Sequence, residues 1–412
     1  MRSFGLIIIL LFLINACNQK MQQTIISQDN PQWIKANELA HKYIITDGHV
    51  DLPYRLKVKN FRLEKEFMGI PVETKEGDFD YVRAKKGGLD APFMSIYIPA
   101  SYQQGGAKEF ADSLINMVEG IISAHPDKFA PGRSPEEIDA NFQKGLISLP
   151  MGMENGAPIG EDLANVGYFY NRGIRYITLT HSKWNQICDS SYDPERHWQG
   201  LSPFGKEVIA EMNRVGIMVD VSHVSDSTFY QVMQLSKAPV IASHSSCRKF
   251  TPGFERNMSD EMIELLGKKG GVIQINFGSA FLDGSIEVKR TEQREELAKL
   301  IEKAGVAEDS PEARKIIDQY RDSHPSLFAD VETVANHIDH VVKLAGIDHV
   351  GIGSDFDGVG DSLPTGLKDV GDYPNLIYLL LKKGYSEEDI AKVCYKNVWR
   401  VWKEVNRVAS NS

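Results

Sequence analysis

Hydrophobic and polar residues along the chain alternate between two kinds of segment. Short apolar runs rich in β-branched residues are typical of buried strands, and the stretches between them repeat their apolar positions with the period of an amphipathic helix. Strands that alternate with helices form a parallel sheet. Eight strand–helix units in about 370 residues predict a closed (β/α)8 TIM barrel, with an open doubly wound sheet as the alternative. The eight runs are 44–49, 93–99, 147–154, 176–181, 217–223, 240–244, 271–277 and 350–355.

Helical periodicity also predicts three features outside the repeating units. A first helix is expected at 33–41. Between the seventh and eighth runs, the charged stretches 291–304 and 311–321 predict a helical insertion at about 283–330, forming part of a lid, a dimer contact or a plain surface excursion. The tail, 386–408, is expected to form one capped amphipathic helix, or two short ones, that closes the barrel. The barrel domain is therefore expected to span 37–412.

The first 17 residues differ from the rest of the chain. Arg2 precedes an almost unbroken hydrophobic stretch, 4–14, which has the length of a signal-peptide core. The stretch ends at Ile14-Asn-Ala-Cys17, which resembles the lipobox of bacterial lipoproteins, in which the cysteine becomes the lipidated N-terminus. We therefore expect a lipoprotein signal at 1–17, lipidation of Cys17 and a membrane-anchored protein of the bacterial cell envelope. An ordinary secretory signal or an uncleaved anchor is the alternative. Residues 18–36 are expected to be a polar tether and the approach to the first helix.

Composition narrows the classes of partner. The net charge of −10 argues against a nucleic-acid partner, which requires a basic patch. Beyond Cys17, the chain has only Cys188, Cys247 and Cys394, and these scattered thiols form neither a disulfide framework nor a cysteine-rich zinc site. The folded protein is expected to depend on its core rather than on crosslinks.

Six of the eight apolar runs end in a side chain that can bind a metal or transfer a proton. In a (β/α)8 barrel the C-terminal ends of the strands form the mouth of the active site, so these side chains are expected to converge on one cavity. A single histidine after a strand is more often a structural hydrogen-bonding residue, but seven such groups are difficult to explain in that way. They are His49, Asp51, Glu154, His181, His223, His244 and Asp355.

The predicted ligands outnumber those that one zinc ion needs. They suit two ions about 3.5–4 Å apart, joined by a bridging carboxylate. Glu154 is the candidate bridge, with His49 and Asp51 on one ion and His223 and His244 on the other. Imidazole and carboxylate ligands without thiolate favour Zn²⁺, although manganese or cobalt also suits them. Such a pair activates a shared water as a hydroxide nucleophile.

Three further residues have candidate roles in substrate chemistry. Asp355, which is not needed as a ligand, can take the proton of the water and pass it to a leaving amine. His181 can donate a hydrogen bond to the oxygen that becomes negative in the tetrahedral intermediate. Arg256 follows the sixth run by a short loop, and its guanidinium is suited to bind a substrate carboxylate.

These residues together resemble the membrane dipeptidase (renal dipeptidase) family of zinc peptidases. The resemblance extends from about residue 40 to residue 405, and the order of its motifs is highly specific. The matching motifs are Asp47-Gly-His-Val-Asp-Leu-Pro53, Gly152-Met-Glu154, Tyr176-Ile-Thr-Leu-Thr-His181, Asp220-Val-Ser-His-Val-Ser225, Ala238-Pro-Val-Ile-Ala-Ser-His-Ser-Ser246, Arg256-Asn257 and Gly351-Ile-Gly-Ser-Asp-Phe-Asp-Gly358.

The resemblance implies a (β/α)8 fold, a centre of two Zn²⁺ ions per subunit and hydrolysis of dipeptides, including those with a C-terminal D-residue. It implies metal roles for His49, Asp51, Glu154, His223 and His244. It also implies substrate-binding roles for His181 and Arg256 and proton transfer by Asp355, which would also contact the substrate. A homodimer is expected by the same resemblance, without a disulfide between the subunits.

Two other functions remain open from the sequence. One is a different metal-dependent amidohydrolase, a deaminase or a lactonase, in which a carbamylated Lys183 bridges the metals. The other is a non-catalytic lipoprotein that binds peptides or metal. His337 and His340, three residues apart on an expected helix, are interpreted as structural because they precede the eighth strand rather than follow it.

Overall fold

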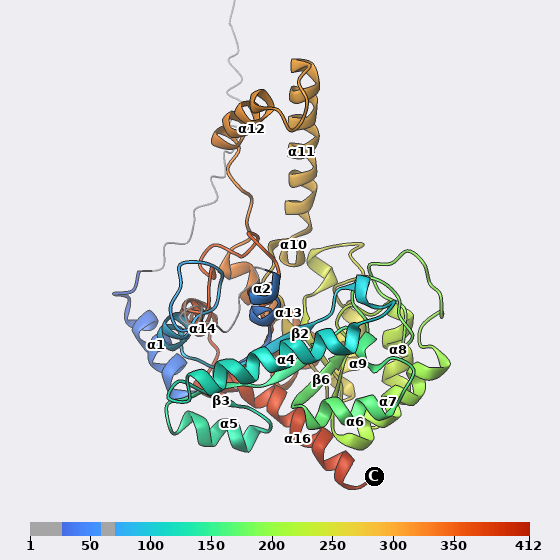
Figure 1. The fold of residues 1–412 in the computed structure, drawn as a ribbon. Helices are drawn as coiled ribbons and strands as arrows, with labels where there is room; N and C mark the ends of the chain where they lie inside the picture. The colour runs from blue at the N-terminus through green and yellow to red at the C-terminus, as the bar shows by residue number, and fades with distance from the viewer. Residues whose placement is uncertain (1–26, 59–70) are drawn as a thin grey trace, which may run out of the picture.

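The computed structural model describes residues 27–58 and 71–412, so the predicted signal peptide, Cys17 and residues 18–26 of the tether lie outside the described residues. Eight strands close into a barrel in the order β1-β10-β9-β8-β7-β6-β5-β2, with every pairing parallel and β2 returning to β1. The predicted (β/α)8 barrel is therefore confirmed (Figure 1). Its strands are β1 Ile45–Val50, β2 Leu89–Tyr97, β5 Met151–Glu154, β6 Ile174–Thr178, β7 Met218–Asp220, β8 Ile241–Ser245, β9 Val272–Ile275 and β10 Val350–Ile352.

One predicted strand is divided in two. The run 147–154 was expected to be continuous, but Pro150 separates β4 (Ile147–Leu149) from β5, because proline has no N–H for a sheet ladder. β4 pairs with β3 (Phe129–Pro131) in a separate two-stranded sheet, and only β5 joins the barrel.

Helices surround the barrel and connect successive strands (Figure 1). Local signals fix their ends. In α7, for example, the Ser202 hydroxyl accepts a hydrogen bond from Gly205 N at 2.8 Å, Pro203 is the first residue, and Gly216 ends the helix with φ 90°. The helices are α1 Pro31–Lys42, α2 Leu52–Val58, α3 Tyr81–Gly87, α4 Ala107–Ala124, α5 Pro135–Phe142, α6 Ala164–Asn171, α7 Pro203–Val215, α8 Asp226–Leu235, α9 Asp260–Lys268, α10 Ser279–Leu282, α11 Gly284–Ala304, α12 Pro311–Ser323, α13 Val331–Ala345, α14 Tyr373–Lys382, α15 Glu387–Ala391 and α16 Asn397–Ser410.

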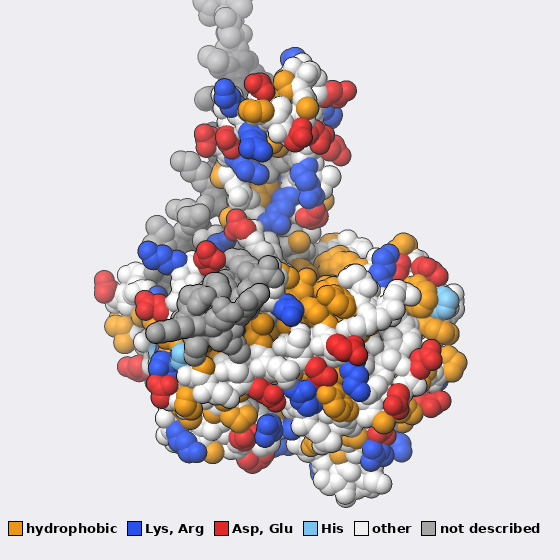
Figure 2. All heavy atoms as spheres, viewed as in Figure 1, with side chains coloured by type: hydrophobic (Ala, Val, Ile, Leu, Met, Phe, Trp, Pro, Cys, Tyr) orange, Lys and Arg blue, Asp and Glu red, His pale blue; other side chains and the backbone are white. Residues whose placement is uncertain are grey.

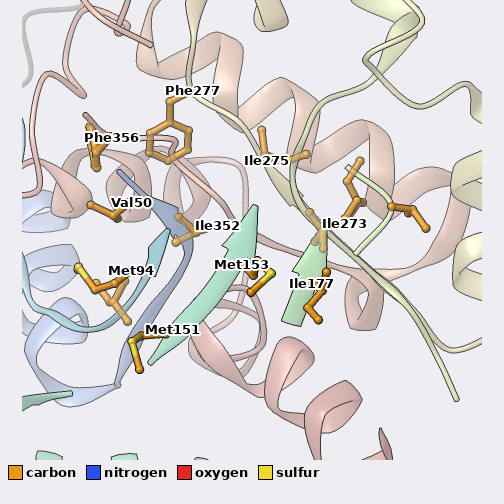
Figure 3. Packing of buried hydrophobic residues seen from close by; sticks show 14 of the residues in the cluster. Val50, Met94, Met151, Met153, Ile177, Ile273, Ile275, Phe277, Ile352 and Phe356 are labelled. Atoms are coloured by element: carbon orange, nitrogen blue, oxygen red, sulfur yellow. The ribbon is translucent and has the colours of Figure 1, made fainter. Parts of the chain in front are cut away.

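The core consists of side chains from the strands and from the inner faces of the helices. Apolar residues from several strands pack around the barrel, as Figure 3 shows for Val50, Met153 and Ile352. At the opposite end from the site, α16 crosses the barrel, and the Trp402 ring lies 5.4 Å from that of Phe93. The predicted capping of the tail is confirmed by a capping box between Ser386 and Asp389.

The insertion between β9 and β10 forms a helical arm of α11 and α12. The prediction of helices in this region is confirmed, but the arm projects away from the barrel rather than lying over it (Figure 1). Charged side chains of both signs cover it (Figure 2). In the described part of the chain, no helix combines the length and apolar character that crossing a bilayer requires. Cys188, Cys247 and Cys394 are buried free thiols.

Candidate metal centre

Five residues predicted as ligands meet at the C-terminal end of the barrel. His49 and Asp51 come from the end of β1, Glu154 ends β5, His223 follows β7, and His244 lies in β8. All five are buried. The structure thus brings together side chains that are up to 195 residues apart in the sequence, as the barrel topology predicted.

Glu154 lies at the middle of this group, and its two carboxylate oxygens face different residues. Oε2 lies 3.4 Å from His49 Nε2, which is also 3.4 Å from Asp51 Oδ2. Oε1 lies 3.0 Å from His223 Nε2 and 3.3 Å from His244 Nε2, and these two ring nitrogens are 2.9 Å apart. A carboxylate between two sets of donor atoms has the arrangement of a ligand that bridges two cations.

The backbone at the strand ends is locally strained. Asn155, directly after Glu154, has φ 80°, His223 has φ 68° and Asp355 has φ 63°. Non-glycine residues in this left-handed region cost of the order of 1–3 kcal/mol each, and such residues concentrate at functional sites. Of the five described non-glycine residues with positive φ, four lie at strand ends around this site, the fourth being Asp357.

The electrostatics of the centre favour neutral imidazoles at His223 and His244, whereas Tyr176 and Glu154 raise the pKa of His49 well above the usual histidine range although burial opposes them. Burial lowers the pKa of His223 and His244 well below the usual histidine range, and nearby Arg256 lowers both further. Burial alone would raise the pKa of Glu154, but the surrounding histidines lower it well below its usual value. Metal ligation requires deprotonated histidine nitrogens and an ionised carboxylate, and the shifts at His223, His244 and Glu154 favour those forms at neutral pH.

Unpartnered polar atoms show that the site fits a divalent metal. Among the described residues, His49 Nε2, Asp51 Oδ1 and His223 Nδ1 are buried without a hydrogen-bond partner, which is costly in a protein interior. Three groups of His, Asp and Glu side chains have potential ligand atoms within 4.8 Å of one another, and Glu154 belongs to two of them. Imidazole and carboxylate donors at this density suit Zn²⁺ or a similar first-row ion.

A cavity of about 620 Å³ opens above the centre. Asp51, Glu154, His181, His223 and Asp355 line its floor, whereas His49 and His244 are buried beneath it. Aromatic side chains form much of its wall, which makes the cavity suitable for a small, partly apolar substrate. The wall residues include Tyr54, Tyr97, Tyr192 and Phe281.

His181 and Asp355 occupy the cavity as predicted. His181 Nε2 lies 3.7 Å from Glu154 Oε1, and burial lowers the pKa of its imidazole, although Glu154 opposes that shift. Asp355 Oδ2 accepts a 2.7 Å hydrogen bond from Asn276 Nδ2. Burial raises the pKa of Asp355 well above its usual value, and the charges of Asp51 and Glu154 add to that rise.

Arg256 lies beneath the cavity wall rather than on its surface. Its Nη1 donates to Ser245 Oγ at 2.6 Å and its Nη2 donates to His244 O at 2.7 Å, so the guanidinium is held rigidly. Its central carbon lies 5.4 Å from the centre of the Phe281 ring. Among the described residues, Nε is buried without a hydrogen-bond partner, which leaves a donor free for an anion.

Two strands contribute residues that sequence reasoning missed. The strand β2 ends in Tyr97, whose ring centre lies 4.7 Å from that of His181, and Asn276, which directly follows β9, contacts Asp355. All eight barrel strands therefore contribute a polar side chain to the site region. The only signal in the sequence was position, since both residues lie at the end of a predicted strand without being metal ligands.

The structure separates the other candidates from the site. His337 accepts a hydrogen bond from Cys247 N at Nδ1, and His340 Nε2 lies 2.8 Å from Asp260 Oδ1, so both are structural, as predicted. Lys183 Nζ lies 3.5 Å from Asp193 Oδ1, and more than half of the Lys183 side chain is exposed. The Lys183 ammonium group therefore lies beside Asp193 on a largely exposed side chain, which argues against the carbamylated-lysine alternative.

Comparisons with known proteins agree with this geometry. The model of a family described as membrane dipeptidase (peptidase family M19) matches residues 34–412. Dipeptidase 3 of Mus musculus is 31% identical over 382 residues, which cover 92% of this chain and 68% of the mouse protein.

Two solved structures share the fold over nearly their whole length. The probable dipeptidase PvdM from Pseudomonas aeruginosa is 27% identical with a TM-score of 0.76, covering 92% of this chain and 99% of its own. A metallopeptidase from Rhodobacter sphaeroides, with a bound phosphinate mimic of the dipeptide L-Ala-D-Ala, is 25% identical with a TM-score of 0.71, covering 88% and 99%.

Proposed function

The chain belongs to the membrane dipeptidase family, and from that premise we propose that it hydrolyses the peptide bond of free dipeptides at a centre of two zinc ions. The observation that carries the proposal is the position of Glu154, with one carboxylate oxygen facing His49 and the other facing His223 and His244. His49, Asp51 and Glu154 would hold one ion, and Glu154, His223 and His244 the other.

Two ions held by these residues would supply a hydroxide at neutral pH and would polarise the carbonyl that is attacked. Asp355 is the proposed proton carrier between the attacking water and the nitrogen of the leaving amine. Its raised pKa suits a carboxyl group that holds a proton after the attack, and the Asn276 amide fixes the orientation of that group.

His181 and Arg256 are proposed to bind the substrate. The neutral His181 imidazole donates a hydrogen bond from a ring N–H to the carbonyl oxygen as negative charge develops on it. Arg256 attracts the C-terminal carboxylate of the dipeptide with a guanidinium that is already rigid and needs no reordering on binding.

Substrate length and stereochemistry follow from the cavity and from the relatives. A volume of about 620 Å³ is at the scale of a small ligand site and accommodates a dipeptide. The Rhodobacter relative binds a mimic of L-Ala-D-Ala. We therefore include dipeptides with a C-terminal D-residue among the proposed substrates.

A substrate panel tests this proposal. The zinc-loaded protein is given L,L- and L,D-dipeptides, together with tripeptides and N-blocked dipeptides as controls. We expect turnover of the free dipeptides of both series, loss of turnover after chelation and recovery on addition of zinc. Absence of dipeptide turnover in a protein that carries two zinc ions would instead favour the peptide-binding alternative.

We further propose that the protein is a lipoprotein of the bacterial cell envelope. The motif Ile14-Asn-Ala-Cys17 after a hydrophobic stretch supports this location. Its test is the intact mass of the detergent-extracted protein, which should begin at Cys17 and carry acyl chains. A Cys17→Ser variant should lack those chains and leave the membrane fraction. An unmodified mass for the natural sequence would contradict the proposal.

A further inference from the structure

His49 is held by a hydroxyl group on the side of its ring away from Glu154. Its Nδ1 lies 2.8 Å from the Tyr176 hydroxyl oxygen, and that hydroxyl donates to Gly48 O at 3.0 Å. A phenol has a single proton, and two oxygens facing each other at 3.0 Å without a proton between them would repel. The proton therefore lies between Tyr176 and Gly48, so His49 Nδ1 carries a hydrogen and donates it to Tyr176.

This arrangement leaves the other ring nitrogen free for a metal. With the proton on Nδ1, the lone pair of a neutral His49 is on Nε2, which is the unpartnered atom that faces Asp51 and Glu154. Tyr176 thus selects the tautomer that a metal ligand requires.

His244 has an equivalent partner built from different residues. Its Nδ1 lies 2.8 Å from Ser243 Oγ, and Ser243 Oγ donates to Asp220 Oδ2 at 2.6 Å. The Asp220 carboxylate already accepts hydrogen bonds from the backbone N–H groups of Ser222 and Ser243, so it acts as an acceptor here too. His244 Nδ1 must then donate to Ser243, which leaves the lone pair on Nε2, 3.3 Å from Glu154 Oε1.

Packing holds Tyr176 rigidly inside the barrel. The residue is fully buried on β6, and its ring centre lies 5.3 Å from that of Phe93. Gly152 on the neighbouring β5 faces the ring, and a methyl group at that position would lie 2.0 Å from Tyr176 Cζ. The glycine two residues before Glu154 is therefore what allows the tyrosine to reach His49.

We propose that Tyr176 and Ser243 are positioning residues, each of which sets the affinity of a different metal ion by fixing the tautomer of one ligand histidine. The inference rests on the two-zinc centre proposed above. The short contacts divide the ligands accordingly, since His49 lies with Asp51 and Glu154 Oε2, and His244 lies with His223 and Glu154 Oε1. His223 differs from both, because its Nδ1 has no hydrogen-bond partner among the described residues.

The experiment is a zinc titration of metal-depleted protein in competition with a chromophoric chelator, which yields two stepwise dissociation constants. Tyr176→Phe and Ser243→Ala each remove one oxygen atom. We expect each variant to weaken one constant by about 10–100-fold, the usual cost of losing such a partner, and to leave the other within about threefold of the natural protein. The two variants should affect different constants, and the double variant should weaken both.

A matched control removes a tyrosine hydroxyl elsewhere. The Tyr385 hydroxyl donates to Asp339 Oδ1 at 2.7 Å, outside the group of metal-ligand candidates, so Tyr385→Phe should leave both constants unchanged. Thermal unfolding checks that each variant is folded, and the Tyr176→Phe result alone decides the matter if Ser243→Ala does not fold.

Two results would overturn the inference. One is a pair of unchanged constants in Tyr176→Phe, and the other is an equal loss in both constants from either variant, which would indicate a general disturbance of the barrel. The natural protein separates these outcomes from a failure of the proposed function. If it binds two zinc ions and hydrolyses dipeptides while the variants match it, only the tautomer inference fails. If it does not bind two zinc ions, the proposed function itself fails.

Discussion

Glu154 is the residue that connects the two halves of the candidate metal centre. Its carboxylate is within 3.4 Å of nitrogen atoms from His49, His223 and His244, which come from three different strands. These strands are separate segments of the sequence, so the contacts of Glu154 form only when the barrel closes and do not depend on local structure. At this scale the proposed roles can be tested separately, because metal ligation, proton transfer and binding of the substrate carboxylate are proposed for different residues.

Asp355→Asn should remove proton transfer without removing metal. General acid–base catalysis contributes about 10²–10⁴-fold to a rate, so we expect kcat to fall by about that factor. The amide keeps the size of the side chain beside Asn276, and zinc content should stay at that of the natural protein. Steady-state kinetics on a dipeptide, with metal analysis of the same sample, checks this. Unchanged kcat would remove Asp355 from the mechanism.

Asp90, which lies outside the candidate metal centre, should make the free energy of unfolding depend on pH. Burial raises its pKa from 3.8 to about 7, although Lys85 at 3.8 Å opposes the rise. A folded-state pKa above the unfolded value means that the folded protein binds the proton more tightly than the unfolded chain does. The stability that this proton contributes is therefore present below pH 4 and is lost as the pH rises to 7. The loss amounts to about 4 kcal/mol by linkage.

The Asp90→Asn variant isolates that contribution, because its amide stays neutral and can still accept the hydrogen bond from Ile45 N. In urea unfolding, the stability of the variant relative to the natural protein should increase between pH 4 and pH 8 by about the same 4 kcal/mol. Parallel stability curves for the two proteins would contradict the assignment.

At the scale of elements, the sequence predicted the barrel and the residues that end most of its strands. Short apolar runs with β-branched residues predicted seven of the eight strands well, and the charged helical stretches of α11 and α12 predicted the insertion. Pro150 was the exception, since the run around it looked continuous although its proline interrupts the ladder. The direction of the helical arm could not be predicted, because it depends on how α10 leaves the barrel and not on any local pattern.

Residues without metal-binding chemistry were the ones missed at the site. Tyr97 and Asn276 end strands as His49 and Glu154 do, but an aromatic or amide side chain at a strand end is most often part of the core or a cap. Tyr176 was even less accessible to sequence reasoning. Its hydroxyl reaches His49 across the interior of the barrel from a strand that is not adjacent to β1, and only the closed sheet produces that contact.

The turn after β10 should be intolerant of even one methyl group. A Cβ at Gly358 would lie 2.1 Å from Asp355 Oδ1 and 2.2 Å from Asp51 Oδ2. Gly358→Ala must therefore displace both carboxylates, and misplacement by about 1 Å costs about 100-fold in catalysis. We expect kcat/KM on a dipeptide to fall by about that factor.

Gly167→Ala is the matched control for this turn. Gly167 lies in α6 with no heavy atom within 4 Å of the added methyl group. This variant should keep full activity and gain about 0.5–1 kcal/mol of stability, because alanine favours a helix more than glycine does. If both variants lost activity equally, the loss in Gly358→Ala could not be assigned to the contacts of its methyl group with Asp355 and Asp51.

For the whole molecule, metal binding and folding stability should be coupled. The ligands come together only in the closed barrel, so zinc is expected to bind the folded chain in preference to the unfolded one. A ligand at 100 times its dissociation constant stabilises the folded state by about 2.7 kcal/mol. Thermal unfolding of the natural protein should therefore shift upward on addition of zinc. A variant with both His223→Ala and His244→Ala should show a smaller shift, and an equal shift would place the stabilising ions elsewhere.

The most direct test of the central claim is the dipeptidase activity of metal-depleted protein as zinc is added in known equivalents per chain. A shared centre around Glu154 predicts no turnover without zinc, activity that increases with occupancy, and saturation at two equivalents. Full activity before any zinc is added, or saturation at one equivalent with the second ion bound and silent, would contradict a hydrolytic centre built from two ions.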